Sequence, residues 1–257
     1  MSSRVFITGA ADGLGRMAAG LLIEGGHRVV LHARSESRAA DALRAVTGAD
    51  GAVHGDLSSI RDCHSIAGQV NRLGTFDAVI HNAGVGDREP RTATVDGLPH
   101  VFAINTLAPY ILTALISKPA RLVYLSSRLH QYGDPSLEDL LWTRRAWDAD
   151  RAYADSKLHD VILAFGIARR WPTVLSNALE PGWVPTRMGG PDAPDDLQAG
   201  PLTQVWLATS DDPEARVSGH YFYHQRRKSP HPAASDEQTQ ARLLSECARI
   251  SGVAMPA

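Results

Sequence analysis

Short runs of β-branched and other apolar residues alternate along the chain with segments whose apolar residues recur at helical spacing. The apolar runs lie at 4–9, 28–33, 51–56, 76–84, 120–127, 173–182 and 219–224. Helical patterns occupy 14–26, 36–46, 58–73, 98–117, 151–170 and 239–250. Apolar strands separated by helices are typical of a parallel sheet covered on both faces. The pattern predicts a doubly wound, three-layer α/β fold with a seven-stranded parallel sheet.

No repeat, low-complexity tract or linker divides the 257 residues, so we expect a single domain over 1–257. Residues 185–200 are rich in Gly, Pro and Asp and indicate a surface loop that covers a substrate. Residues 225–238 indicate a solvated loop before the last helix.

Charge and cysteine content exclude several classes of protein. The net charge is −2, which gives no basic surface for nucleic acid or an anionic membrane. The longest apolar run, 101–116, is short for a membrane span and contains Asn105 and Pro109. Cys63 and Cys247 match no metal or redox spacing, so we expect no metal. We therefore expect a cytoplasmic protein with a small-molecule partner.

The stretch "TGAADGLG" (8–15) ends the first predicted strand and opens the first helix. Gly9, Gly13 and Gly15 allow a tight turn and a close approach of the backbone to a pyrophosphate at the helix N-terminus. The spacing is G-x-x-x-G-x-G, and a glycine-rich turn without a ligand is the alternative. The strand–loop–helix context favours a dinucleotide site.

The residues after the second and third strands bear on the choice of dinucleotide. Arg34 and Ser35 stand where an acidic residue would bind a ribose 2′-hydroxyl, and an Arg suits a 2′-phosphate. We therefore expect NADP(H) rather than NAD(H), although Arg34 could instead cap the next helix or lie in solvent. Asp56 and Leu57 end the third strand near the expected adenine, and Asp56 is also a candidate N-cap for the helix from Ser58.

The stretch "AYADSKLHD" (152–160) places Tyr153 and Lys157 four residues apart on a predicted helix. Helical i, i+4 spacing puts both side chains on one face. The pKa of tyrosine is about 10, too high for acid–base work at neutral pH, and a nearby ammonium lowers it. The pair is a candidate for proton transfer to a carbonyl oxygen.

Seven motifs in this order resemble the short-chain dehydrogenase/reductase family: "TGAADGLG", "DL" (56–57), "HNAG" (81–84), Asn105, "VYLSS" (123–127), "YADSK" (153–157) and "EPGWVPT" (180–186). The resemblance implies a Rossmann-type domain and hydride transfer between a nicotinamide and a carbonyl or alcohol carbon. "SSRLH" (126–130), "SKL" (156–158) and "SGHYFY" (218–223) are similar to the retinol dehydrogenase-like and protochlorophyllide reductase-like branch.

The resemblance also implies roles for individual residues. Tyr153 would be the acid/base, Lys157 would tune it and hold the ribose, Ser127 would polarise the substrate oxygen, and Asn105 would support a proton relay. Ser126 is the alternative to Ser127, and Asn105 could instead be a satisfied polar residue inside a helix. The expected cofactor-binding residues are Gly9, Ala11, Asp12, Gly13, Leu14, Gly15, Arg34, Ser35, Asp56, Leu57, Asn82, Ala83, Gly84, Tyr153, Lys157, Pro181, Gly182, Val184 and Thr186.

Ser127 and Tyr153 are 26 residues apart, about twice the separation in many relatives, so 128–150 resembles an insert. Tyr132, Trp142 and Trp147 could line a substrate pocket or equally pack the insert against the body. His81, His130 and His159 are expected to be structural.

The sequence as a whole predicts an NADP(H)-dependent oxidoreductase that acts on a ketone, an aldehyde or a secondary alcohol. A non-catalytic dinucleotide-sensing regulator and a nucleotide-sugar epimerase or dehydratase are the alternatives. The intact Tyr153–Lys157 pair disfavours the first, and the lack of a larger C-terminal domain disfavours the second. The resemblance further implies a homo-oligomer, a dimer or tetramer, formed through 98–117 and 151–170.

Overall fold

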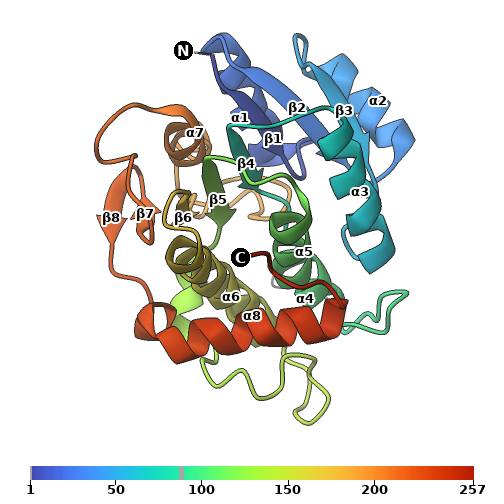
Figure 1. The fold of residues 1–257 in the computed structure, drawn as a ribbon, viewed down its shortest axis with the longest axis vertical. Coiled ribbons are helices and arrows are strands. Elements are labelled where there is room, and N and C mark those ends of the chain that lie inside the picture. Colours follow the sequence, from blue (N-terminus) through green and yellow to red (C-terminus); the bar gives the residue numbers. More distant parts are fainter. Residues whose placement is uncertain (1, 87–89) are drawn as a thin grey trace.

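The residues that the computed structural model describes, 2–86 and 90–257, form an eight-stranded sheet with helices on both faces (Figure 1). The strand order is β3-β2-β1-β4-β5-β6-β7-β8, and β1 to β7 are parallel. The strands are β1 (Arg4–Ile7), β2 (Arg28–Ala33), β3 (Gly51–His54), β4 (Ala78–His81), β5 (Arg121–Leu125), β6 (Leu175–Glu180), β7 (Tyr221–Tyr223) and β8 (Arg226–Lys228).

The seven predicted parallel strands are confirmed, and β8 is an additional strand within 225–238, where we expected only a loop. It pairs antiparallel with β7 at the edge of the sheet. Its residues, Arg-Arg-Lys, are exposed and carry no apolar alternation. The turn into it uses His224 and Gln225 at positive φ, 48° and 61°, without the glycine that normally signals a two-residue hairpin.

The helices form two layers around the sheet (Figure 1). Apolar residues of α1, α2 and α7 form one core with β1, β2 and β4, and those of α3, α5, α6 and α8 form a larger core on the opposite face. The α-helices are α1 (Gly13–Glu24), α2 (Glu36–Ala45), α3 (Ile60–Arg72), α4 (His100–Phe102), α5 (Ala108–Leu115), α6 (Ala149–Arg170), α7 (Leu202–Thr209) and α8 (Glu237–Ser251). Helix α7 was not predicted, although Pro201 directly precedes it and Pro213 follows its end.

Several helices begin with a side-chain cap. Ser35 caps α2, Asp148 caps α6 and Asp236 caps α8, each accepting a backbone N–H three residues on. The prediction that Asp56 caps the third helix was wrong. Ser59 is the N-cap and accepts the N–H of Asp62, and α3 starts at Ile60, two residues after the predicted start. Asp56 instead closes a turn by accepting the N–H of Ser58.

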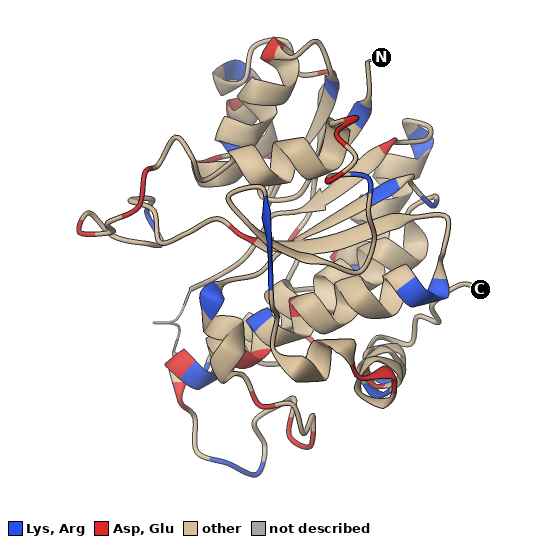
Figure 2. Ribbon diagram, turned by 90° about the vertical axis from the view of Figure 1, so that its left-hand side faces the viewer, with Lys and Arg blue, Asp and Glu red and all other residues tan. Residues whose placement is uncertain are grey.

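Charged residues of both signs are interspersed over the outer helices and loops, while the central strands are largely uncharged (Figure 2). This distribution fits a sheet that is buried on both faces. Among the described residues, no helix has the length and hydropathy needed to cross a membrane.

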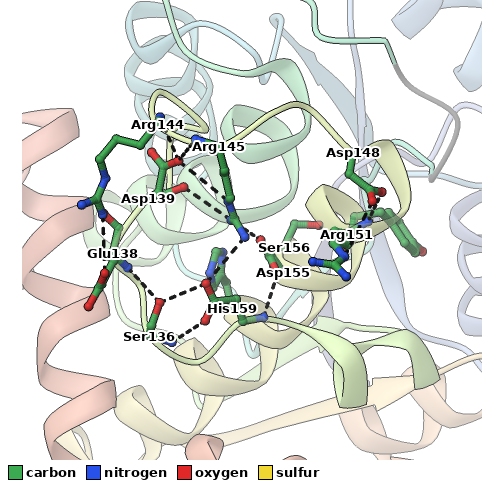
Figure 3. A network of polar contacts seen from close by, with 12 residues as sticks. Ser136, Glu138, Asp139, Arg144, Arg145, Asp148, Arg151, Asp155, Ser156 and His159 are labelled. Carbon is green, nitrogen blue, oxygen red and sulfur yellow. Dashed lines mark hydrogen bonds and ion pairs between the residues drawn. The ribbon is translucent and has the colours of Figure 1, made fainter.

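The insert between β5 and α6 is held by a polar network on α6 (Figure 3). The guanidinium of Arg145 contacts Asp155 of α6 at 2.5 Å and stacks over the ring of Trp142, 3.6 Å from its centroid. The second oxygen of Asp155 accepts the backbone N–H of Asp134 at 2.7 Å. Trp142 is buried and packs the insert against the body, whereas Tyr132 is exposed.

We predict that Arg145→Ala lowers the free energy of unfolding by about 1–3 kcal/mol, because Asp155 stays buried without its charge partner. Denaturant unfolding measures the change. The matched control is Arg144→Ala, since Arg144 is exposed and pairs with Glu138 at the surface; its effect should stay below about 0.5 kcal/mol. Equal losses in both variants would contradict the role of the Arg145 contacts.

Candidate active site

The predicted dinucleotide site lies where the chain reverses its direction of winding across the sheet, between β1 and β4. In such sheets, ligands bind beyond the carboxyl ends of the strands at this point. The hydroxyl of Thr8, at the end of β1, accepts the backbone N–H groups of Asn82 and Ala83, both at 3.0 Å. The Asn82 amide in turn donates to the carbonyls of Thr8 and Gly9 at 3.0 and 3.2 Å. The "HNAG" segment and the glycine loop are thus fixed to each other.

The glycine loop packs too closely for side chains. Gly9 has φ +65°, and a Cβ there would lie 2.9 Å from Ala83 Cα. A Cβ at Gly15 would lie 2.5 Å from both the Asn82 amide nitrogen and the Gly9 carbonyl oxygen. Gly13, at φ +52°, has open space instead. The loop therefore turns sharply into the N-terminus of α1, where backbone N–H groups favour an anion.

The end of β2 presents two arginines at the start of α2. Arg34 is exposed, and Ser35 is the N-cap of the helix. Arg38, one turn later, is also exposed and contacts Asp12 at 3.3 Å. Beneath them, His32 accepts the N–H of Gly9 and contacts the Gly55 carbonyl at 3.0 Å. Burial lowers the pKa of His32 to about 4, so this histidine is a neutral support for the loop.

Asp56 and Leu57 follow β3 at the same edge of the sheet. Leu57 is buried, and Asp56 is partly exposed and donates its backbone N–H to Asp62 at 3.2 Å. The two residues follow the carboxyl end of β3, which lies next to the carboxyl end of β2 because the two strands pair in parallel.

Asn105 lies in a five-residue π-helical turn, Ala103–Leu107, that interrupts the predicted helix at 98–117. Its side chain is fully buried. The amide oxygen accepts the N–H of Val85 at 2.9 Å, and the amide nitrogen donates to the Val85 carbonyl and to Ser156 at 3.1 and 3.0 Å. Asn105 therefore joins the segment after β4 to helix α6. Such π-turns often occur at functional sites.

The two serines that end β5 differ in their environment. Ser126 is buried and donates its hydroxyl to the Lys157 carbonyl at 2.7 Å. Ser127 is partly exposed, and among the described residues its hydroxyl makes a single hydrogen bond, accepting the N–H of Leu129 at 3.2 Å in the turn η2 (Arg128–Tyr132). Ser127 thus keeps a hydroxyl proton to donate, whereas the proton of Ser126 is used within the fold.

Tyr153 and Lys157 lie on adjacent turns of α6. Tyr153 is partly exposed, and the Lys157 ammonium lies 5.7 Å from the centroid of its ring. Lys157 is buried and donates to the Leu125 carbonyl at 2.7 Å and to Asp160 at 2.8 Å. A Cβ at Gly84 would lie 3.5 Å from the ammonium nitrogen, so the backbone after β4 forms the opposite wall.

The segment after β6 continues into the loop 185–200. Gly182 has φ +87°, and a Cβ there would lie 2.8 Å from the carboxylate of Asp195, which also accepts the N–H of Trp183 at 2.6 Å. Val184 is buried, and the Thr186 hydroxyl accepts the N–H of Gly189 at 3.2 Å. Pro181 begins this turn and is partly buried.

The loop 185–200 crosses the dinucleotide region. Met188 lies close to Gly86, and Gly200 packs against Leu14 of the glycine loop. Its contacts therefore reach both the segment after β4 and the first turn of α1. Trp183 and Met188 remain about half-exposed at this surface.

Sequence reasoning missed four residues that the structure places at this site: Thr8, His32, Arg38 and Asp160. The pattern gave no signal for Thr8 or His32, whose contacts join separate strand ends. Arg38 could have been found, since it lies in the first turn of the predicted helix that follows Arg34. Asp160 could have been noticed as a carboxylate three residues after Lys157.

Comparison with known proteins gives the class. The sequence model described as short chain dehydrogenase matches residues 3–132. The "Uncharacterized oxidoreductase AN7799" of Emericella nidulans is 44% identical over 98% of each chain. Human "Retinol dehydrogenase 13" is 32% identical over 98% of this chain and 85% of its own, and DnrU of Streptomyces sp. (strain C5), provisionally named a daunorubicin C-13 ketoreductase, is 34% identical over 88% and 84%.

Among solved structures, an uncharacterised protein from Mycobacterium paratuberculosis is similar with a TM-score of 0.86 and 25% identity, over 99% of this chain and 95% of its own. The fold and the site define an oxidoreductase that uses a nicotinamide dinucleotide. The chain belongs to the short-chain dehydrogenase/reductase family, in its retinol dehydrogenase-like branch.

The residues present fit a dinucleotide on structural grounds. Gly9 and Gly15 leave no room for side chains inside the loop, so its backbone turns tightly into a helix N-terminus, with open space beside Gly13. Arg34 and Arg38 supply positive charge after the end of β2, and Lys157 supplies a buried ammonium beside the end of β5.

We predict that Gly15→Ala weakens cofactor binding at least about tenfold and destabilises the fold by about 1–3 kcal/mol, because the added methyl group forces the loop away from Asn82. Dinucleotide titration and denaturant unfolding measure the two effects. Gly20→Ala, in the same helix and with open space around it, is the matched control and should be neutral or stabilising. Wild-type affinity in Gly15→Ala would contradict this account of the loop.

Proposed function

We propose that the protein is an NADP(H)-dependent reductase of a ketone or aldehyde, also able to oxidise the corresponding alcohol, with Tyr153 as the acid/base. The observation that carries the proposal is the partly exposed Tyr153 beside the buried ammonium of Lys157, next to the strand end that Ser127 follows. The name of DnrU supports a carbonyl substrate, and that of retinol dehydrogenase 13 supports an alcohol.

The chemistry requires a proton for the alkoxide that develops as hydride arrives from the reduced nicotinamide. Tyr153 donates its phenolic proton to that oxygen. The Lys157 ammonium stabilises the phenolate that remains. Ser127 donates its hydroxyl proton to the same oxygen in a hydrogen bond and so orients the carbonyl.

Lys157 and Asn105 have supporting roles in this proposal. The third N–H of the Lys157 ammonium is available for the hydroxyls of the nicotinamide ribose, since Leu125 and Asp160 use two. Asn105 holds the backbone after β4 against α6, which fixes the distance between Gly84 and Lys157. Its position beside Lys157 suits a relay that returns a proton to Tyr153.

The remaining predicted residues bind the dinucleotide in this proposal. Ala11, Asp12, Gly13 and Leu14 surround the pyrophosphate, and Asp56 and Leu57 flank the adenine. Arg34, Ser35 and Arg38 bind the 2′-phosphate at the N-terminus of α2, where charge and helix dipole act together. Pro181, Gly182, Val184 and Thr186 hold the carboxamide end.

The single domain 1–257 would form its substrate pocket from two segments. The loop 185–200 lies over the cofactor region through Met188 and Gly200 and is placed to close on a substrate. The insert 128–150 begins with η2 directly after Ser127, and its buried Trp142 packs against the body of the protein. Exposed Trp183 and Met188 favour a substrate with an apolar part.

We predict that Tyr153→Phe lowers kcat for NADPH-dependent carbonyl reduction by about 10²–10⁴-fold, because the proton donor is lost. NADPH affinity should change less than about threefold, since the ring and Lys157 remain. A panel of apolar ketones and aldehydes, followed by NADPH oxidation, measures the rate. The exposed Tyr132→Phe is the matched control and should retain wild-type kcat. Retention of activity in Tyr153→Phe would refute the assignment.

We predict that Arg34→Asp lowers NADPH affinity at least about tenfold and changes NADH affinity little, because only NADPH carries the 2′-phosphate. Fluorescence titration with each cofactor measures the preference. Arg44→Ala, on the same helix but at its far end beside Asp41, should change neither affinity. An unchanged ratio of NADPH to NADH affinity in Arg34→Asp would refute the NADP(H) assignment.

A further inference from the structure

Asp160 lies three residues after Lys157 on α6, and its carboxylate is among the most buried in the protein. Its exposed fraction is 2%, and that of Lys157 is 5%. Asp160 Oδ2 accepts a hydrogen bond from the Lys157 ammonium at 2.8 Å. The two charges form a pair where α6 packs against the end of β5, which contributes the Leu125 carbonyl as the second acceptor at 2.7 Å.

This pair has a consequence for the charge of Lys157. Burial alone acts to lower the pKa of Lys157, and a buried lysine without a counter-ion can become neutral near physiological pH. The negative charge of Asp160, that of ionised Tyr153 and the hydrogen bond to Asp160 more than offset this, so the pKa of Lys157 lies above its ordinary value. The ammonium therefore stays charged inside the protein.

The pair also fixes the direction in which the ammonium points. Two of its three N–H donors go to Leu125 and Asp160, which are both buried. The Tyr153 ring centroid lies 5.7 Å from the ammonium, and a Cβ added at Gly84 would lie 3.5 Å from it, so both residues adjoin the ammonium. Without Asp160, the flexible lysine side chain would lose one of its two fixed partners.

Tyr124 of β5 is another titratable group that interacts electrostatically with Asp160, but burial raises its pKa far above the neutral range. Its hydroxyl contacts Thr113 at 2.7 Å, and its ring packs against His81. Burial lowers the pKa of His81 to about 3, so both groups are neutral.

We propose that Asp160 is a positioning residue for the reaction: its carboxylate holds the Lys157 ammonium charged and directed toward Tyr153 and the cofactor ribose. The inference rests on the proposed function of Lys157 and adds the residue that keeps this buried ammonium charged and oriented. Asp160 itself touches neither substrate nor cofactor.

The test is Asp160→Asn, which preserves the shape of the side chain and removes its charge. The basic limb of the pH profile for NADPH-dependent carbonyl reduction should move to lower pH by about 1 unit or more. The reason is that the Tyr153–Lys157 pair loses its first proton more readily without the carboxylate, whichever residue releases it. Between pH 7 and 9, the Kd for NADPH should rise about threefold or more in the variant as Lys157 becomes neutral, and stay flat in the wild type.

Two further variants separate positioning from mere structural support. Asp160→Glu restores the charge but displaces it, so the basic limb should stay within about 0.5 unit of wild type while kcat falls about tenfold. Asp155→Asn removes a similarly buried, ion-paired carboxylate from the same helix. This variant should lower the free energy of unfolding and leave the basic limb of the pH profile unchanged.

The outcomes distinguish the inference from the proposed function. A wild-type protein that binds NADPH but reduces no carbonyl would refute the proposed function, and the NADPH titrations would still decide the role of Asp160. An unshifted limb and a flat Kd in Asp160→Asn would overturn the inference. If Asp160→Asn does not fold, a wild-type kcat in Asp160→Glu would overturn it instead.

Discussion

The arrangement of the site depends on the junction between helix α6 and the end of β5. Two hydrogen bonds make this junction in opposite directions: Ser126 donates its hydroxyl to the Lys157 carbonyl, and the Lys157 ammonium donates to the Leu125 carbonyl. Both lie in the buried interior, where water does not compete and a lost hydrogen bond leaves a costly unpaired group. The junction brings Tyr153 to the strand end that carries Ser127, although 26 residues separate them in sequence.

The insert could have disturbed this junction, and its own contacts explain why it does not. The turn η2 starts directly after Ser127 and docks on α6, where Gly133 packs against Ala154 and Leu158 without space for a side chain. Arg145 then contacts Asp155, which lies two residues after Tyr153 on α6. Both ends of the insert are therefore fixed on α6, and its length does not separate the two candidate catalytic hydroxyls.

Features encoded by neighbouring residues could be predicted from the sequence. The seven parallel strands, most helices and the glycine loop follow from local patterns of apolar residues and glycine, and the structure contains them. Strand β8 could not be predicted because it is polar and its turn lacks glycine, whereas α7 was missed although Pro201 precedes it and Pro213 follows it. The packing of Trp142 was undecided, because whether an aromatic side chain lines a pocket or fills a core depends on the position of Arg145, which local sequence does not encode.

The same distinction applies within the site. Tyr153 and Lys157 were found because they share one helix face at a recognisable spacing. The bonds from Thr8 to Asn82 and from Asn105 to Val85 join residues 74 and 20 positions apart, so no short pattern contains them. Sequence therefore identified which groups are present, and only tertiary contacts showed which of them still have a proton to donate, as the contrast between Ser126 and Ser127 illustrates.

The Lys157–Asp160 pair affects the stability of the fold and the chemistry of the site in different ways. Burying two charges is expensive, and well-packed apolar residues of similar volume often stabilise a fold as much or more. Packing alone therefore gives no reason for an ion pair at the centre of the α6 interface. A buried ammonium directed at a phenol does provide a reason, because its effect on a neighbouring proton is strongest where water is excluded. On that ground we regard the pair as part of the chemistry of this site rather than as support for the fold.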